Sequence, residues 1–111
     1  MVEAKYLKVA KDLLAKHPYF LLAKSWCPDV KYAINTLKEH KKYDGYFYAY
    51  ELDKLPDQAE AYRIEQAFTE LAGRKWVPSI FVNGQYWGTE QDLKVLRSQD
   101  KLKETLDKLI V

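Results

Sequence analysis

Cys27 is the residue of this chain best suited to chemistry, because it is the only cysteine among 111 residues and lies between a predicted strand and a predicted helix. An apolar run, residues 19–23, precedes it, and apolar side chains three or four apart follow it over 28–41, which is typical of one helix face. Pro28 suits a first helical turn, since its φ is fixed and its missing N–H is not needed there. We therefore expect the Cys27 sulfur at a helix N-terminus, where a thiolate nucleophile is stabilised.

A lone cysteine can also be a small buried hydrophobic residue. The surroundings of Cys27 argue against that alternative. Trp26 and Pro28 flank the sulfur, and Lys24 and Lys31 are near in sequence. A buried structural cysteine needs none of these neighbours, so we favour a reactive thiol.

The elements around this corner follow from periodicity and from turn residues. The first two predicted strands are separated by a helix, so they should run parallel, whereas Asn83-Gly84 predicts an antiparallel hairpin between the last two. The sequence therefore predicts an α/β fold, a four-stranded mixed sheet flanked by helices. The expected elements are helix 3–16, strand 19–23, helix 28–41, strand 46–52, a helix from an Asp57 cap to Ala72, strand 79–82, strand 86–87, helix 89–97 and helix 100–110.

Length and composition predict a single domain, residues 1–111, with an ordinary core. The net charge of +2, with lysines and acids interspersed, gives no reason to expect nucleic acid or an anionic membrane as partner. No apolar run approaches the roughly 18 residues of a membrane span, and a single cysteine suits the cytoplasm. Cys27, His17 and His40 are too widely spaced for a metal site, so no metal is expected. We expect a monomer.

Three segments resemble the glutaredoxin family of the thioredoxin superfamily, and the resemblance covers essentially the whole chain. Residues 24–28, Lys-Ser-Trp-Cys-Pro, are similar to the family's Lys-Ser-x-Cys-Pro. Residues 73–84 resemble its Gly-x-x-Thr-Val-Pro-x-Ile-Phe-Val-x-Gly, and residues 88–93 resemble its Gly-Gly-x-x-Asp-Leu. The sequence Trp-Cys-Pro-Asp at residues 26–29 most resembles that of a fungal branch, the glutaredoxin-8 type, whose motif is Trp-Cys-Pro-Asp-Cys. The resemblance implies the thioredoxin/glutaredoxin fold.

The resemblance also implies a role for each matching residue. Cys27 would be the catalytic nucleophile, and glutathione would be its co-substrate, without a metal. Lys24 would pair with the glycine carboxylate of glutathione, and Val77 would bind the tripeptide strand to strand. Pro78 would be the family's cis-proline. The remaining glutathione-binding residues would be Trp26 and Trp76 beside the groove and Thr89, Glu90, Gln91 and Asp92 at the γ-glutamyl end.

Several positions depart from the family pattern. Val30 stands where the second cysteine of a dithiol motif falls, so no Cys-x-x-Cys disulfide can form; a natural monothiol form and a replaced resolving cysteine both remain open. Asp29 would oppose the helix dipole beside the sulfur and repel glutathione. Glu65 replaces a glutamine and cannot donate to a carboxylate. Trp76 replaces a threonine and narrows the groove, and Thr89 replaces a glycine. The motif is not the Cys-Gly-Phe-Ser of iron–sulfur glutaredoxins, so a cluster is not expected.

Three functions remain as alternatives. The first is a glutathione-dependent thiol–disulfide oxidoreductase of weak activity that works through Cys27 alone on glutathionylated or disulfide-containing proteins. The second is a thioredoxin-like protein-disulfide reductase, favoured by Trp26 and Asp29. The third is a redox-fold binding module whose thiol reacts poorly. We rank them in this order.

Overall fold

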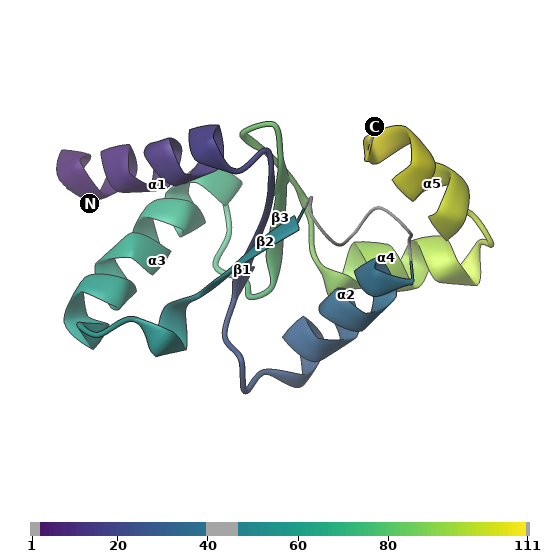
Figure 1. Ribbon diagram of the computed structural model, residues 1–111, viewed down its shortest axis with the longest axis horizontal. Helices are drawn as coiled ribbons and strands as arrows, with labels where there is room; N and C mark the ends of the chain where they lie inside the picture. The colour runs from purple at the N-terminus through teal and green to yellow at the C-terminus, as the bar shows by residue number, and fades with distance from the viewer. Residues whose placement is uncertain (1–2, 40–46, 111) are drawn as a thin grey trace.

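Five helices, four strands and one short 3₁₀ helix follow one another in the computed structural model, which describes residues 3–39 and 47–110 (Figure 1). In chain order they are α1 (Ala4–Lys16), β1 (Tyr19–Ala23), α2 (Pro28–Lys38), β2 (Phe47–Glu51), η1 (Leu52–Lys54), α3 (Gln58–Ala72), β3 (Ser79–Val82), β4 (Gln85–Gly88), α4 (Glu90–Ser98) and α5 (Leu102–Leu109).

The strands form one mixed sheet in the order β2-β1-β3-β4, with β1 in the interior. Strands β1 and β2 are parallel, with Ala23 opposite Glu51 at their carboxyl ends. Strand β3 runs antiparallel to both β1 and β4. Because all five residues of β1 are buried, its apolar run packs on both faces of the sheet. The predicted fold class and strand directions are confirmed.

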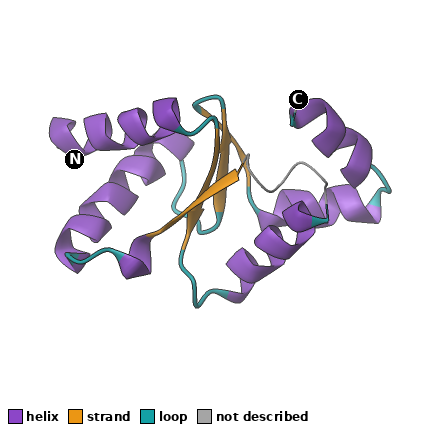
Figure 2. Cartoon of the chain, in the orientation of Figure 1, coloured by secondary structure: helices purple, strands orange, loops and turns teal. Residues whose placement is uncertain are grey.

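Helices cover both faces of the sheet, with α1 and α3 on one side and α2, α4 and α5 on the other (Figures 1 and 2). Alternate residues of β1 point into opposite cores, as the period of a strand requires. The core beneath α1 and α3 contains Tyr6, Ala10, Leu14, Phe20, Leu22, Leu52, Ile64, Ala67, Phe68 and Phe81. The core beneath α2, α4 and α5 contains Tyr19, Leu21, Ala33, Leu37, Ile80, Val82, Leu93, Leu106 and Ile110.

Local signals explain where the elements begin and end. Pro28 is the first residue of α2, and the Asp57 carboxylate caps α3 by accepting from the N–H groups of Ala59 and Glu60. Gly73 ends α3 with a left-handed φ of 80°, which glycine adopts without a Cβ penalty. The β3–β4 turn is the predicted hairpin turn, with positive φ at both central residues.

Two predictions differ from the structure. Helix α2 ends at Lys38 rather than at residue 41, and residues 40–46, on which the end of that helix and the start of the next strand were predicted, lie outside the described residues. The short helix η1 was not predicted; the sequence 46–52 was assigned to a strand because of its aromatic residues, but the chain leaves the sheet after Glu51. This turn matters for the site, because η1 carries Asp53.

Candidate functional site

Cys27 occupies the N-cap position of α2, at the predicted strand-to-helix corner, and its side chain makes no capping hydrogen bond. Its own N–H donates to the Lys24 carbonyl at 3.0 Å, and its carbonyl accepts from the N–H of Lys31 at 3.1 Å. The thiol is half-buried and is the one cysteine of the sequence. A sulfur in this position lies beside the free N–H groups of the first helical turn, which favour a negative charge. Asp29 lies in the same turn, and its negative charge opposes the stabilisation of an anion by these N–H groups.

The segment that leads into β3 faces the sulfur. The Cys27 Sγ lies 4.0 Å from the carbonyl oxygen of Val77, and the Val77–Pro78 peptide bond is cis, as the resemblance implied. A hollow of about 360 Å³ opens here. Its lining residues are Lys24, Trp26, Cys27, Asp29, Glu65, Lys75, Trp76 and Val77. We call it the sulfur hollow. The half-buried sulfur of Cys27 opens to this hollow.

Lys24 is already paired within the chain. Its ammonium lies 3.2 Å from the carboxylate of Glu65 on α3, and Glu65 is only 7% exposed. A buried carboxylate needs a cationic or hydrogen-bonding partner, and Lys24 supplies one. An incoming carboxylate must therefore compete with Glu65 for this lysine.

The loop before Cys27 is anchored by η1. The Asp53 carboxylate accepts hydrogen bonds from the Ser25 N–H at 2.9 Å and from the Ser25 hydroxyl at 2.5 Å. These bonds, first from the hydroxyl and then from the backbone, hold the pKa of Asp53 below its usual value of 3.8. Asp53 therefore stays ionised at neutral pH and holds the loop that carries the sulfur.

Trp76 is joined to the start of α4. Its indole N–H donates to both oxygens of the Glu90 carboxylate, at 3.1 and 2.9 Å, and Glu90 is fully buried. The Arg74 guanidinium stacks 4.7 Å from the centre of the Trp76 ring. Trp76 is thus held on two sides as a wall of the sulfur hollow.

The N-terminus of α4 is capped by its own side chains. The Asp92 carboxylate accepts from the Thr89 N–H at 2.8 Å, and the Thr89 hydroxyl accepts from the Gln91 N–H at 3.2 Å, which completes a capping box. Gly88 is needed next to it, because a Cβ there would lie 2.5 Å from the Asp92 carboxylate. A ligand carboxylate at this helix end would have to compete with Thr89 and Asp92.

A second hollow of about 300 Å³ adjoins the first. Both are lined by Lys24, Trp26 and Glu65, and the second continues along η1 and α3. The residues that line only this second hollow are Leu52, Asp53, Gln58, Ala61 and Tyr62. We call it the flanking hollow.

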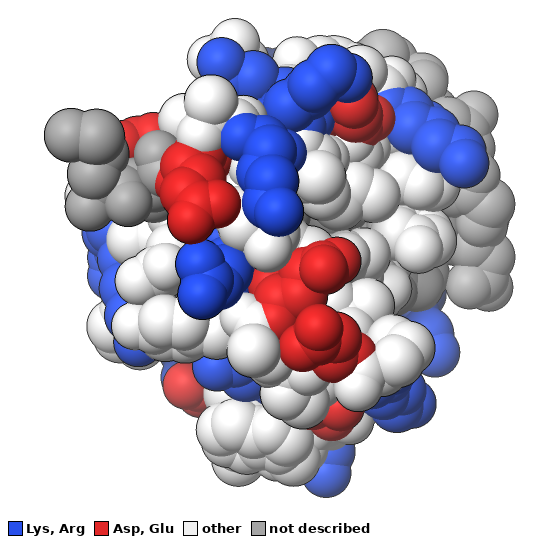
Figure 3. All heavy atoms as spheres, turned by 90° about the vertical axis from the view of Figure 1, so that its left-hand side faces the viewer, with Lys and Arg blue, Asp and Glu red and all other residues white. Residues whose placement is uncertain are grey.

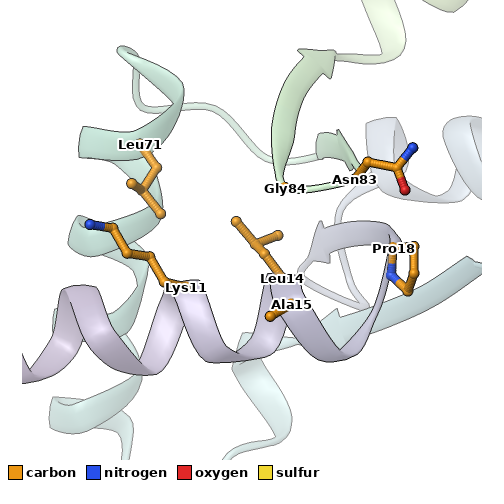
Figure 4. A pocket seen from close by; sticks show the side chains of 7 residues that line it. All are labelled: Lys11, Leu14, Ala15, Pro18, Leu71, Asn83 and Gly84. Atoms are coloured by element: carbon orange, nitrogen blue, oxygen red, sulfur yellow. The ribbon is translucent and has the colours of Figure 1, made fainter.

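A larger hollow, of about 470 Å³, lies at the opposite end of the sheet, between α1, α3 and the β3–β4 turn (Figure 4). Lys11, Leu14, Leu71 and Asn83 are among its lining residues, and none of the lining side chains carries a thiol or a hydroxyl group. Size alone would favour it as the site. The chemistry favours the sulfur hollow, because the thiol of Cys27 lines it.

Charges of both signs are interspersed on the face that carries α1 and α3, as the sequence predicted (Figure 3). Within residues 3–39 and 47–110, no group of three or more His, Cys, Asp or Glu side chains is placed to hold a metal ion. None of the helices described there is long and apolar enough to cross a membrane.

Comparison with known proteins identifies the family of this chain. A family model described as Glutaredoxin matches residues 19–87, which include β1, the sulfur and the cis-proline. The chain belongs to the glutaredoxin family. It is 34% identical over 105 residues to Glutaredoxin-8 of Saccharomyces cerevisiae, with 94% of each chain covered. It is also 34% identical over 110 residues to Glutaredoxin-1 of the same yeast, with 99% of this chain and 98% of the relative covered.

The three-dimensional comparison agrees and confirms the thioredoxin fold. The solution structure of yeast dithiol glutaredoxin Grx8 superposes with a TM-score of 0.82 and 32% identity, covering 96% of each chain. That relative is described as dithiol, whereas this glutaredoxin has a single sulfur at the helix start. Val30, one helical turn beyond Cys27, is 1% exposed and belongs to the packed interior.

The structure brings together part of the set of residues predicted to bind glutathione. Cys27, Lys24, Trp26, Trp76 and Val77 line one hollow. The four predicted residues of the α4 start do not line it; the set Thr89, Glu90, Gln91 and Asp92 is connected to it through the Trp76–Glu90 contact. The glutathione-binding roles of all these residues stay predictions.

Three contributors to the site were missed in the sequence. Asp53 lies in η1, which the sequence pattern does not indicate. Ser25 has no feature beyond its place in the family motif, and Tyr62 lies in a helix with no feature to distinguish it. Glu65 departs from the family pattern in sequence, but its pairing with Lys24 is evident only in the structure. A short-range signal existed only for Asp53, which follows directly after the predicted strand 46–52.

Proposed function

We propose that this glutaredoxin is a glutathione-dependent thiol–disulfide oxidoreductase that works through Cys27 alone, with low activity. The observation that carries the proposal is the position of Cys27 at the α2 N-terminus, with its Sγ 4.0 Å from the Val77 carbonyl in an open hollow. Family membership supplies the reaction class, and the single sulfur selects the one-cysteine route.

The reaction balances with one cysteine. The Cys27 thiolate attacks the glutathionyl sulfur of a mixed disulfide, forming Cys27–glutathione disulfide and releasing the substrate thiolate, which takes a proton from solvent. A second glutathione thiolate then attacks the glutathionyl sulfur on Cys27. Glutathione disulfide forms, and the Cys27 thiolate is regenerated.

Low activity is expected because the groups that would bind glutathione are already partnered. Lys24 is paired with Glu65, and the α4 N–H groups are partly occupied by Thr89 and Asp92. Asp29 adds a negative charge to the turn in which the thiolate must form. Each contact raises the cost of binding an anionic tripeptide.

The test is to incubate the reduced protein with glutathione disulfide and follow Cys27 by intact mass, then add glutathione and time the reversal. We expect an adduct that forms faster than on an unstructured cysteine peptide and that glutathione removes. Cys27→Ser should form no adduct and should turn over no glutathionylated substrate. Turnover retained in Cys27→Ser, or an adduct no faster than the peptide's, would overturn the proposal.

A thioredoxin-like protein-disulfide reductase is the second candidate, favoured by the exposure of Trp26, which is 65% exposed directly beside the sulfur. An exposed indole offers contact area to a protein surface rather than to a tripeptide.

Glutathione and proteins with accessible disulfides or glutathionylated cysteines are the proposed partners, and the cytoplasm, where thiols are kept reduced, is the proposed location.

A further inference from the structure

The flanking hollow adjoins the sulfur hollow but is not lined by Cys27 itself. The two hollows share Lys24, Trp26 and Glu65, so a chain that leaves the sulfur hollow past these residues enters the flanking one. A polypeptide spans about 3.3 Å per residue when extended, so residues a few positions from a bound cysteine reach this space. The hollow thus suits a substrate longer than glutathione.

Two exposed aromatic rings border the flanking hollow. Trp26 is 65% exposed and Tyr62 is 55% exposed, and both are among the largest apolar side chains that the described residues leave in solvent. Rings of this kind bind the aliphatic stem of a lysine or arginine and attract its cationic head through the ring face.

The charge of the flanking hollow is negative. Among its lining residues, the ammonium of Lys24 is paired with the carboxylate of Glu65. The Asp53 carboxylate receives only neutral donors, both from Ser25, and forms no ion pair with a described residue. Its neighbour Lys54 is engaged by Glu51 at 3.5 Å. A cationic group entering the hollow would meet one carboxylate, that of Asp53, that has no ion-pair partner among the described residues.

We infer that the flanking hollow binds a lysine or arginine side chain of a polypeptide substrate, whose stem lies against Trp26 and Tyr62 and whose head pairs with Asp53. The inference rests on the proposed exchange at Cys27, because the polypeptide is held there through its cysteine sulfur. This glutaredoxin then selects, among disulfide-bearing polypeptides, those with a basic residue near the reacting cysteine.

The test uses short peptides with one cysteine capped as a disulfide with thionitrobenzoate. The Cys27 thiolate attacks the peptide sulfur, a Cys27–peptide disulfide forms, and thionitrobenzoate leaves as a coloured anion that reports the rate. Lysine is placed two or three residues before or after the cysteine, and each peptide is matched by one with glutamate. Each rate is divided by that of the same peptide with 2-mercaptoethanol, which removes its intrinsic reactivity.

We expect at least one lysine position to react about threefold faster or more than its glutamate match, and the difference to shrink at high salt. Tyr62→Lys should abolish it, because a cation then occupies the hollow. Val95→Lys is the matched control, since it adds the same charge at an exposed residue of α4 that lines neither hollow, and it should keep the preference.

Equal normalised rates for every lysine and glutamate pair would overturn the inference, as would a preference that survives Tyr62→Lys. Glutathione capped in the same way serves as the reference for the sulfur hollow. If it reacts with Cys27 faster than with 2-mercaptoethanol while the peptides show no charge preference, the proposed function stands and only this inference fails. If neither capped glutathione nor any capped peptide reacts faster with Cys27 than with 2-mercaptoethanol, the proposed function itself fails.

Discussion

The Lys24 ammonium lies 3.2 Å from the Glu65 carboxylate, so the lysine nearest the Cys27 sulfur in sequence is paired with a carboxylate of the same chain. The pair joins the loop before Cys27 to the middle of α3. It makes Glu65 a competitor of any anionic substrate, and this competition can be measured.

Glu65→Gln should free Lys24 for the carboxylate of glutathione. Because a hydrogen bond to a charged group contributes about 1.5–3 kcal/mol, we expect KM for a glutathionylated peptide to fall by about tenfold or more, with a smaller change in kcat. Steady-state kinetics with a glutathionylated peptide give both values. Glu70→Gln, an exposed change one helical turn further along α3, should leave KM unaltered. A KM that is unchanged or raised in Glu65→Gln would refute this role of the ion pair.

Trp76→Phe should destabilise the fold, because the buried Glu90 carboxylate would lose its indole donor. An unsatisfied buried acceptor costs about 1–3 kcal/mol, so we expect a loss of that size in the free energy of unfolding measured with urea. Trp87→Phe is the control. It removes an indole N–H that forms no hydrogen bond to the described residues, and it should cost less. Equal losses in the two variants would show that the Trp76–Glu90 bond contributes little.

Asp53 should make the stability of the fold depend on pH in the acid range. Its pKa is lowered in the folded chain by the Ser25 hydroxyl and N–H, so its contribution is fully present above the unfolded value of 3.8 and is lost as the pH falls through the lower folded value. Asp53→Asn should therefore be less stable than the wild type at neutral pH, and the difference should shrink below pH 3.8.

Urea unfolding of Asp53→Asn and wild type over this pH range measures that difference directly. Asp12→Asn removes the carboxylate of an exposed pair with Lys8 on α1, and we expect its effect at neutral pH to be smaller. A difference for Asp53→Asn that stays constant from neutral to acid pH would contradict the assignment of the shift to Ser25.

Val30→Cys should convert the one-sulfur site into a dithiol site. Val30 lies three residues beyond Cys27 on α2, the spacing of a Cys-x-x-Cys motif. After exposure to glutathione disulfide, we expect the variant to lose its glutathione adduct by forming an internal disulfide, seen by intact mass, and to gain turnover in a thioredoxin-reductase assay. Val30→Ala, which has no second sulfur, should retain the adduct. An adduct that persists in Val30→Cys would show that the buried position is out of reach of Cys27.

Much of the fold could be predicted because its signals are local. The apolar run of β1, Pro28 at the start of α2 and the Asn83–Gly84 turn each determine an element from a few neighbouring residues. The position of Cys27 followed from two of these signals, and the family motif from the residues around it.

The partners of the site residues could not be predicted in the same way. Asp53 and Ser25 are 28 residues apart, and Glu90 and Trp76 are 14 apart, so each pairing depends on how separate elements pack. Glu65 could be seen as a departure from the family pattern, yet its contact with Lys24 exists only once α3 and the loop after β1 are brought together in the folded chain. Charged residues on a helix give no periodic signal that distinguishes a partner from a solvated residue.

The parallel register of β1 and β2 also determines the position of the loop that carries the Cys27 sulfur. Ala23 is opposite Glu51, and two residues beyond each of them stand Ser25 and Asp53, which bond to each other. Ser25 and Asp53 lie side by side because each is two residues beyond a paired strand end. A slip of β2 by one residue would move the Asp53 carboxylate by about 3.3 Å relative to Ser25. The position of the Cys27 loop therefore depends on the pairing of the edge strand, so substitutions in β2 that shift this pairing should displace Cys27 although they do not contact it.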